Sequence, residues 1–430
     1  MKKLLIISYD FPPSITGVRR VLKLIRYLPE SGWESLVLTV KPIRTVRLDP
    51  APLAELSDKG VPIFRAGSLD PYRLTEKFFP RKTEETKPIG HSSERLKGAM
   101  EFLRRWVFIP DDRCGWIPFA ALKGLTLIRQ FKPDAMLTTS YPQSAHIIGA
   151  ILKKITNLPW TADFRAAWTQ NAEFFKPATS LHALFQMKLE KTVAKNCDIL
   201  TSVSEPISAH FKKILGEANH KVHTLPNGYD ESDFENLAAH PTAKFTLVYS
   251  GTFFGERTPR YFLQALSDLL KKHPEWRKDF HVRFFSSVDD STAQTINEKA
   301  IGDVVRIEGM CSYIENIQQQ MNAAILLLFI PPGPHSDVMM TQKVFEYLRT
   351  GRPILAMIPD GACKNLLSPF EGVKIVEPLD VEGIKLCVED LYLKWKAGGL
   401  GAPQQRKIEQ FERRNLTKQL AALLDSICRK

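Results

Sequence analysis

Two side chains of opposite charge, Lys343 and Glu346, lie three residues apart in the segment "QKVFEYLRTGRPILA" (342–356). The segment begins with the periodicity of an amphipathic helix and ends, after a Gly-Arg-Pro turn, in an apolar strand pattern. A spacing of three places both charges on one helical face. Two interpretations follow. The residues form a surface ion pair worth well under ~1 kcal/mol, or they hold a polar ligand at the start of the helix.

A turn between a strand and a helix offers a second chemical site in "YSGTFFGERTP" (249–259). Gly251 and Gly255 give the backbone freedom to approach a ligand, and Arg257 comes just before the helix. The pattern favours a phosphate that is bound by loop amides and clamped by Arg257. Glycine-containing turns after strands are common, so an ordinary turn is the alternative interpretation.

The equivalent turn near the N-terminus is "SYDFPPSITGVRR" (8–20), in which Gly17 opens the backbone. Arg19 and Arg20 fall in the first helical turn, where the helix dipole disfavours cations by roughly 0.3–1 kcal/mol. A negatively charged ligand near this turn explains the violation, and two solvated arginines explain it equally well. The G-x-G-x-x-G fingerprint of dinucleotide-binding proteins is missing here.

Strand patterns alternate with helical patterns along the chain, which is typical of βαβ units around parallel sheets. Two series of six strands predict two doubly wound α/β domains. The predicted strands are Leu4–Tyr9, Leu36–Val40, Ala135–Thr138, Trp160–Phe164, Ile199–Val203 and Val222–Leu225 in the first series, and Phe245–Ser250, His281–Phe285, Val304–Glu308, Ile325–Ile330, Pro353–Met357 and Val373–Val376 in the second.

We place the first domain at 1–235, the second at 236–404, and a final helix at 405–430. A turn signal at 225–234 and a Gly-rich linker at 396–405 set these boundaries. Residues 41–112 fit the alternation poorly and are treated as a basic insertion. Within it, "RLKGAMEFLRRWVFI" (95–109) has the spacing of an amphipathic helix with Arg95, Lys97, Arg104 and Arg105. That helix either packs on its domain, as is usual, or lies on an anionic membrane.

The composition is that of a soluble globular protein, with 44% hydrophobic and 25% charged residues in 430. Apolar runs are too short to span a bilayer, so we expect a cytoplasmic location, with peripheral contact at the inner face of the membrane left open. Six scattered cysteines argue against a disulfide framework and a structural zinc site. Residues 1–240 hold 34 Lys and Arg against 25 Asp and Glu, so an anionic partner is expected to meet this half.

Five segments, in this order and at these spacings, resemble bacterial family 4 glycosyltransferases of the two-Rossmann GT-B fold. They are "FPPSITGVRRVLKLIRYLPESGWESLVLT", "WTADFRAAWT", "LPNGYD", "YSGTFFGERTP" and "QKVFEYLRTGRPILA". The resemblance covers nearly the whole chain and is weakest across 41–112. It implies a cleft between two Rossmann-like domains, with a sugar nucleotide held mainly by the second domain, the acceptor held by the first, and a final helix that packs on the first domain.

The resemblance also implies roles for individual residues. Glu346 resembles the residue that hydrogen-bonds the nucleotide ribose, Arg257 and Lys343 resemble diphosphate contacts, and Gly17 resembles a backbone donor to the diphosphate. The expected donor-binding residues are Gly17, Gly251, Thr252, Arg257, Met310, Tyr313, Asp337, Lys343 and Glu346. The expected acceptor-side residues are Asp10, Phe11, Arg19, Asp163 and Arg165. The expected catalytic positions are Arg257, Lys343 and Ala166.

Two positions depart from the family pattern. Where relatives carry the first Glu of a Glu, seven residues, Glu motif, this chain has Val338, so recognition of the donor sugar is expected to differ, through Asp337 or His335. Relatives with "DFR" commonly continue with Asp, whereas this chain has Ala166. Either this position is dispensable, or a functional carboxylate has been lost.

The expected activity is transfer of a sugar from a UDP- or GDP-sugar to a small-molecule, glycan or lipid-linked acceptor, with retention of configuration, in cell-surface polysaccharide or glycoconjugate biosynthesis. We expect no cofactor and no metal, since Arg257, Lys343 and loop amides can stabilise the departing diphosphate. The alternatives are a sugar-nucleotide epimerase on the same fold and a non-enzymatic binder of anionic polymer. Nucleic acid is not an expected partner, because the basic half has no stripe of interleaved aromatic residues.

Overall fold

The structure, a computed structural model, describes residues 1–14, 17–42, 53, 56, 60–70, 102, 106–171, 175–253, 255–400 and 404–428. Most of the predicted insertion at 41–112 lies outside these residues. The amphipathic helix proposed within 95–109, with Arg95, Lys97, Arg104 and Arg105, therefore also lies largely outside the described part of the chain.

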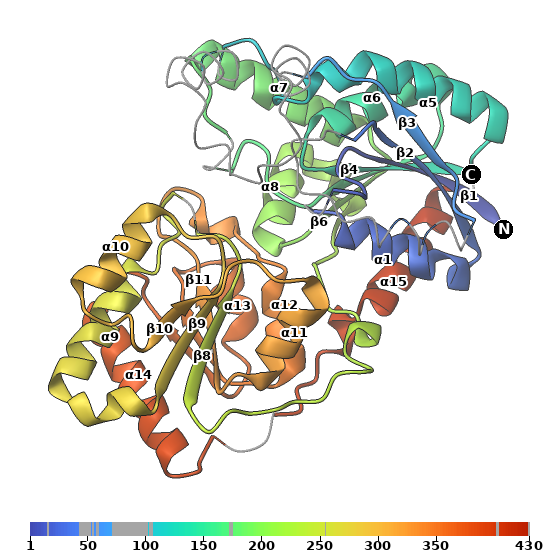
Figure 1. The fold of residues 1–430 in the computed structure, drawn as a ribbon. Coiled ribbons are helices and arrows are strands. Elements are labelled where there is room, and N and C mark those ends of the chain that lie inside the picture. The colour runs from blue at the N-terminus through green and yellow to red at the C-terminus, as the bar shows by residue number, and fades with distance from the viewer. Residues whose placement is uncertain are drawn as a thin grey trace, which may run out of the picture. The chain divides into compact units, whose positions relative to one another are not determined.

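The chain folds into two units (Figure 1). The first consists of Met1–Pro226 with Arg413–Lys430, and the second of Asn227–Glu412. The boundaries fall about eight residues from those we set at 235 and 405, because both flanking segments supply core residues to the second unit: Tyr229 and Phe234 from one, and Ile408 from the other. The chain passes between the units twice, near residues 227 and 412, and we call these two segments the crossings. The crossings lie next to each other, since Tyr229 N donates to Phe411 O at 3.2 Å.

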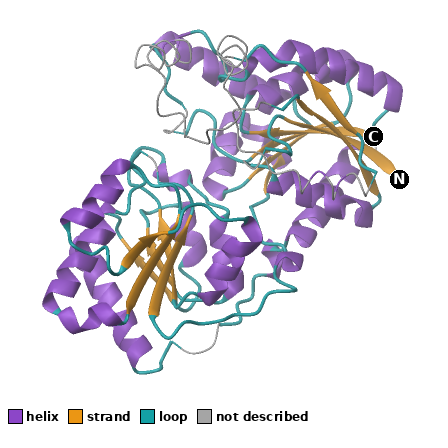
Figure 2. Cartoon of the chain, viewed as in Figure 1, coloured by secondary structure: helices purple, strands orange, loops and turns teal. Residues whose placement is uncertain are grey.

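The first unit is built on a seven-stranded parallel sheet in the order β3-β2-β1-β4-β5-β6-β7. Its strands are β1 (Lys2–Ser8), β2 (Trp33–Val40), β3 (Ile63–Ala66), β4 (Ala135–Ser140), β5 (Trp160–Phe164), β6 (Ile199–Ser202) and β7 (Val222–Thr224). Its described helices are α1 (Arg19–Tyr27), α5 (Ile117–Phe131), α6 (Ser144–Thr156), α7 (Ser180–Asn196), α8 (Glu205–Leu215) and α15 (Arg413–Cys428). Helices cover both faces of the sheet (Figure 2).

The second unit contains a six-stranded parallel sheet in the order β10-β9-β8-β11-β12-β13. The strands are β8 (Phe245–Ser250), β9 (Phe280–Phe285), β10 (Val305–Ile307), β11 (Ile325–Phe329), β12 (Ile354–Met357) and β13 (Val373–Val376). The helices are α9 (Arg260–Lys272), α10 (Asp290–Glu298), α11 (Tyr313–Asn322), α12 (Lys343–Thr350), α13 (Ala362–Leu367) and α14 (Val381–Lys396). Two apolar clusters, one on each side of the sheet, form its core.

The predicted fold class, α/β with two doubly wound Rossmann-like sheets, is confirmed. Each of the twelve predicted strands has an observed counterpart, and β3 is the strand that the sequence reading missed. The four residues of β3, "IFRA", are only partly buried apart from Ala66, so they lack the continuous apolar run of the central strands. In both sheets the order reverses beside the first strand of the unit, which is where ligands of doubly wound folds bind.

The C-terminal helix α15 belongs to the first unit, where it packs beside α1 (Figure 1). Its buried face is Leu416, Leu420, Ala421 and Leu424, which join Leu24 of α1 in one apolar cluster. An ion pair of 2.6 Å between Lys2 Nζ and Asp425 Oδ1 ties the two ends of the chain together. The chain thus leaves the first unit, forms the second, and returns.

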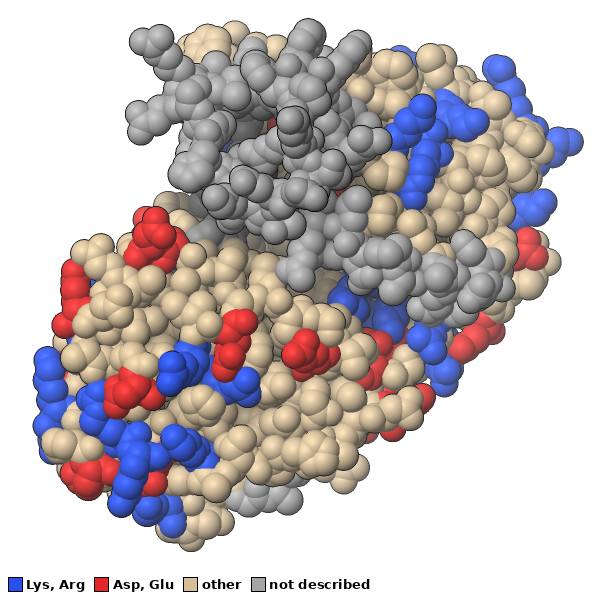
Figure 3. Space-filling model, viewed as in Figure 1, with Lys and Arg blue, Asp and Glu red and all other residues tan. Residues whose placement is uncertain are grey.

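Charges are spread unevenly over the molecular surface. On the face drawn in Figure 3, acidic and basic side chains of the second unit are interspersed, whereas those of the first unit are mainly basic. Across the described residues, no helix combines the length and apolar character required for a membrane span.

Candidate functional site

The start of α12 meets the end of β8 at the carboxyl edge of the second sheet. Lys343, the first residue of α12, places Nζ 4.3 Å from the centre of the Tyr249 ring. Gly251 follows β8 with φ +145°, and a Cβ built on it would collide with Lys343 Nζ. Only glycine therefore allows this approach of the amine to the backbone, and the structure brings Gly251 and Lys343, both predicted donor-site residues, together.

The Lys343 ammonium has no carboxylate within ion-pair distance and no hydrogen-bond partner among the residues that the structure describes. Its pKa is lowered from the ordinary 10.5 to about 7. Burial is the main cause, and the positive charge of Arg257 adds to it against the opposing effect of Glu346. Since a buried cation is costly without a counter-charge, this edge of the sheet is set to receive an anion.

Glu346 lies one helical turn further along α12 and is buried, with 5% of its surface exposed. Its Oε1 accepts hydrogen bonds from Tyr313 Oη and from Gln342 Nε2, each at 3.1 Å. Its Oε2 accepts from Gln320 Nε2 at 3.4 Å. The carboxylate is thus fixed by neutral donors, and the opening alternative of a close Lys343–Glu346 ion pair does not match the described structure, in which the pair interacts only at longer range.

The other predicted donor-site residues lie on loops at the same edge. Tyr313 begins α11 and contacts Glu346, whereas Thr252, Met310 and Asp337 are exposed. Arg257 is partly buried and lines a pocket with Tyr261, Phe329, Pro331 and Leu379. Val338, which replaces the first family Glu, is buried. The position therefore packs into the protein here and offers no polar group to a ligand.

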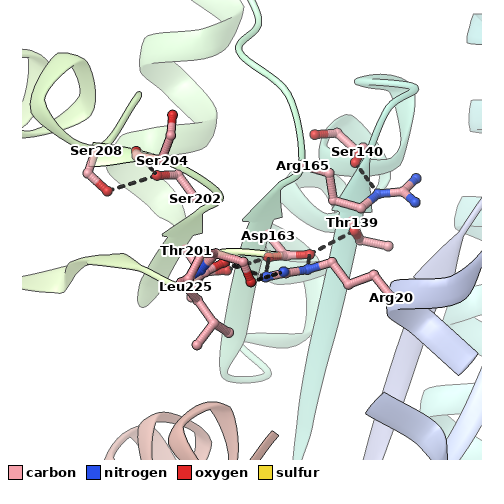
Figure 4. A network of polar contacts seen from close by, with 11 residues as sticks. Arg20, Thr139, Ser140, Asp163, Arg165, Thr201, Ser202, Ser204, Ser208 and Leu225 are labelled. Atoms are coloured by element: carbon pink, nitrogen blue, oxygen red, sulfur yellow. Dashed lines mark hydrogen bonds and ion pairs between the residues drawn. The ribbon is translucent and has the colours of Figure 1, made fainter. Parts of the chain in front are cut away.

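In the first unit, Asp163 at the end of β5 is fully enclosed by partners (Figure 4). Arg20 Nε and Nη2 donate to its two oxygens at 3.0 and 2.8 Å. Thr139 and Thr201 hydroxyls donate to the same oxygens at 2.9 and 2.7 Å. Although burial alone would raise it, the pKa of Asp163 is lowered, because Arg20 and these hydroxyls favour the charged form.

This arrangement leaves Asp163 no free oxygen for an acceptor, in contrast to the role expected from the sequence. Arg20 is also committed, since it donates to Leu225 O at 2.9 Å and to Pro226 O at 2.8 Å. The arginine that seemed misplaced in the first turn of α1 is 3% exposed and serves as the counter-charge of Asp163. The pair joins α1 to the ends of β5 and β7.

Arg165, two residues after Asp163, donates to three backbone carbonyls: those of Gly17, Ser140 and Tyr141, the last at 2.9 Å. Figure 4 shows its guanidinium beside Ser140. A Cβ on Gly17, where φ is +66°, would lie 2.9 Å from Arg165 Nη1 and 3.2 Å from Asp10 Oδ2. Gly17, Asp10 and Arg165 are therefore brought together, and Arg165 fixes the loop that carries Gly17.

Asp10 is the partly buried carboxylate of this edge, 3.8 Å from Arg165 Nη2. Burial raises the pKa of Asp10 to about 6, against the favourable charges of Arg165 and Arg113. Phe11 is buried in the core and Arg19 is partly buried at the start of α1. Ala166, also partly buried, follows Arg165 in the loop after β5.

The sequence reading missed a second group of charges at this edge, centred on "PDDR" (110–113). Asp111 Oδ2 accepts from Ser144 N at 2.8 Å and its Oδ1 accepts from Ser144 Oγ at 2.7 Å, at the start of α6. Arg113 lies 3.5 Å from Asp112 Oδ1 and 3.9 Å from Asp70 Oδ1. The Asp-Asp-Arg run is the sequence signal that could have indicated this group. No group of three or more His, Cys, Asp and Glu side chains suited to a metal occurs among the described residues.

Comparisons with known proteins agree with this geometry. Residues 89–233 match Glycosyltransferase Family 4. A search among curated protein sequences finds no match. Among solved structures, the chain is similar to a lipopolysaccharide outer core galactosyltransferase in its apo form, with 12% identity, a TM-score of 0.60, and coverage of 99% of each chain.

Two further solved structures have the same architecture. Sucrose-phosphate synthase from Thermosynechococcus elongatus matches with 13% identity and a TM-score of 0.59, covering 100% of this chain and 96% of that one. UDP-GlcNAc 2-epimerase from Neisseria meningitidis, bound to UDP-GlcNAc, matches with 14% identity and a TM-score of 0.58, covering 99% of this chain and 100% of that one. At such low identity these likenesses show the fold. Together with the family match over residues 89–233, they agree with the resemblance to family 4 glycosyltransferases noted in the sequence, and they confirm the predicted fold of two Rossmann-like domains.

Proposed function

We propose that this glycosyltransferase moves a sugar from a UDP- or GDP-sugar to an acceptor hydroxyl, with retention of configuration and without a metal ion. The observation that carries the proposal is the Lys343 amine, held against Gly251 and Tyr249 with Arg257 nearby and no carboxylate partner in the described chain. A diphosphate supplies the negative charge that this position lacks. The UDP-GlcNAc bound in the epimerase structure named above is consistent with such a ligand.

In the proposed reaction, the bond between the anomeric carbon and the diphosphate oxygen breaks, and the acceptor oxygen forms the new bond. Negative charge grows on the departing diphosphate, where Lys343, Arg257 and the amides after β8 stabilise it. These cationic side chains take the part that a divalent ion plays in other transferases. The proton of the acceptor hydroxyl passes to the departing diphosphate, on which the negative charge develops.

Glu346 is proposed to bind the ribose hydroxyls of the donor. Its carboxylate already accepts from Tyr313, Gln342 and Gln320, so its orientation is set before a ligand arrives. Preorganisation of this kind lowers the entropy lost on binding. At the first sheet, Asp10 is proposed to face the acceptor, with Arg165 as the residue that fixes the neighbouring backbone at Gly17.

The test is a panel of UDP- and GDP-sugars, measured first by thermal stabilisation. A ligand at 100 times its dissociation constant stabilises the protein by about 2.7 kcal/mol. The best donor is then incubated with candidate glycan and lipid-linked acceptors in EDTA, and the anomeric configuration of the product is read by NMR. Lys343→Ala should lose donor binding, whereas the exposed Lys271 on α9 provides a matched control, Lys271→Ala.

Each part of the proposal has its own contrary outcome. A strict need for a divalent ion would exclude the cationic mechanism, and an inverted product would exclude retention. Interconversion of the free sugar nucleotide without an acceptor would assign the chain to the epimerase reaction instead. Absence of binding to every donor in the panel would remove the nucleotide-sugar assignment altogether.

A further inference from the structure

The helix α7 exposes apolar side chains over its N-terminal half. None of residues 180–189 is buried. Leu181 is 73% exposed, Leu184 58%, Phe185 49% and Met187 47%. Leu181, Leu184 and Phe185 follow the i, i+3, i+4 spacing of one helical face, so they form a continuous stripe. Monomeric proteins rarely expose apolar side chains in such a cluster, and a patch of this kind marks an interaction site.

Aromatic residues outside α7 extend the stripe. Trp106 is 46% exposed, and its ring contacts the His182 ring with centroids 5.6 Å apart. Phe102 stacks on Trp106 at 5.7 Å and is also exposed. Tryptophan, with an apolar ring and a polar N–H, is the side chain that concentrates at the boundary between lipid and water.

The same face of α7 continues into positive charge. Lys188, Lys191 and Lys195 are exposed at the next positions of the stripe, and no carboxylate of the described chain lies within ion-pair distance of them. Glu190, the sole acidic residue of α7, is turned inward and buried. We name the set Leu181, Leu184, Phe185, Lys188, Lys191 and Lys195 the outer face of α7.

We propose that the outer face of α7 is a docking surface for an anionic lipid bilayer. The apolar side chains enter the boundary between headgroups and acyl chains. The lysines, whose aliphatic side chains are long, place their ammonium groups at the level of the lipid phosphates. A protein partner would need acidic groups opposite the lysines and, on the same surface, an apolar groove for the leucines and Phe185. A bilayer offers both along its whole surface, and the absence of acidic side chains from this face fits its negative charge.

The inner side of α7 connects this surface to the first sheet. Gln186 Oε1 accepts from Trp168 Nε1 at 2.8 Å. Glu190 accepts from Thr169 Oγ1 at 2.6 Å and lies 3.2 Å from His210 Nε2. Both contacts hold the loop that follows β5 and includes Ala166. A bilayer on the outer face would therefore lie about one helix diameter, ~10 Å, from that loop, which suits an acceptor that a lipid carries.

The experiment is cosedimentation of the full chain with vesicles of phosphatidylcholine, with and without phosphatidylglycerol. We expect binding only to the anionic vesicles, and weaker binding as salt rises from about 0.1 M to about 1 M, which shortens the screening length from about 10 to about 3 Å. The double variants Leu184→Ser/Phe185→Ser and Lys188→Glu/Lys191→Glu should each lower vesicle affinity at least tenfold. Matched controls are Leu386→Ser on α14, which is 61% exposed, and Lys271→Glu on α9.

Thermal unfolding and size-exclusion chromatography of the same proteins separate the rival occupants. Unchanged melting temperatures and a monomeric parent, together with lost vesicle binding, support the bilayer. A melting temperature lowered by several degrees in Leu184→Ser/Phe185→Ser would show that the chain covers this face with its own residues, and a parent dimer abolished by that variant would assign the face to a second copy. Either result, or equal vesicle binding by parent and both variants, overturns the proposal. None of these measurements depends on the donor or on transfer activity.

Discussion

The carboxyl edges of both sheets carry charged side chains but use them differently. In the first unit, Asp163 and Arg20 satisfy each other, and Arg165 is occupied by backbone carbonyls. In the second, Lys343 is near a positive charge and rests on an aromatic ring. The comparison shows that charge near a sheet edge is not in itself evidence of a binding site. What distinguishes a site is charge that the folded chain leaves uncompensated.

The largest effect should come from removal of the buried Arg20–Asp163 ion pair at the edge of the first sheet. Asp163→Ala leaves Arg20 buried without its counter-charge, and loss of one partner of a buried pair costs about 3–5 kcal/mol of unfolding free energy. Urea unfolding measures this loss. The double variant Arg20→Met/Asp163→Leu should recover much of it, since no buried charge remains. An Asp163→Ala protein as stable as the parent would mean that the edge is not held together by this pair.

The next effect concerns Lys343 at the edge of the second sheet, whose charge the folded chain leaves uncompensated. Lys343→Ala should lower turnover by about 2.7–4 kcal/mol of transition-state stabilisation, roughly a hundredfold to a thousandfold. Its melting temperature without ligand should not fall, because the parent's lowered Lys343 pKa disfavours the folded state at neutral pH. Steady-state kinetics tests the loss of turnover, and scanning calorimetry tests the melting temperature. Arg306 on β10 is exposed, so Arg306→Ala serves as a control. A destabilised but fully active variant would give Lys343 a structural role.

A smaller effect is expected from pH. A nucleotide sugar carries no group that titrates near neutrality, and it binds the charged form of Lys343. Because the pKa of Lys343 in the free protein is about 7, donor affinity should be constant below pH 7 and fall up to tenfold per pH unit above it. Binding above pH 7 should take up a proton, which calorimetry detects in buffers of different ionisation enthalpy. Lys343→Arg should abolish this pH dependence, and a parent whose affinity is unchanged between pH 6 and pH 9 would contradict the low pKa.

The smallest effect compares two buried tyrosines of the second unit. Tyr249 Oη is buried with no hydrogen-bond partner among the described residues, whereas Tyr392 Oη donates to Asp279 at 2.7 Å. Removal of an unpaired buried hydroxyl should stabilise the protein by up to about 1 kcal/mol. Tyr249→Phe should therefore raise the melting temperature by about 2–4 °C, and Tyr392→Phe should lower it. Scanning calorimetry of the two variants decides; a lower value for Tyr249→Phe would indicate a bond that its hydroxyl makes in solution.

Strand patterns predicted the fold well because they are local: an apolar run such as "ILLLF" in β11 needs no partner to be recognised. The sequence pattern did not predict β3, because this short strand lies at a sheet edge and most of its four residues are only partly buried. The site was only partly predictable. Glycines and cations around Gly251 and Lys343 stand in recognisable turns, but the pairing of Arg20 with Asp163 joins residues 143 apart, and nothing in either local sequence indicates it. Tyr249 was likewise missed, since a tyrosine in a strand looks like an ordinary core residue.

The adjacent crossings near Tyr229 and Phe411 mean that the second unit is an insertion in the first, with both chain ends on the host. A protease that cuts one crossing would leave two fragments held together by the uncut crossing and by the packing of α15 beside α1, whereas cleavage at both would remove every covalent link between the two units. A nicked preparation should thus migrate as two bands on a denaturing gel yet elute as one species from a native column, and retain donor binding.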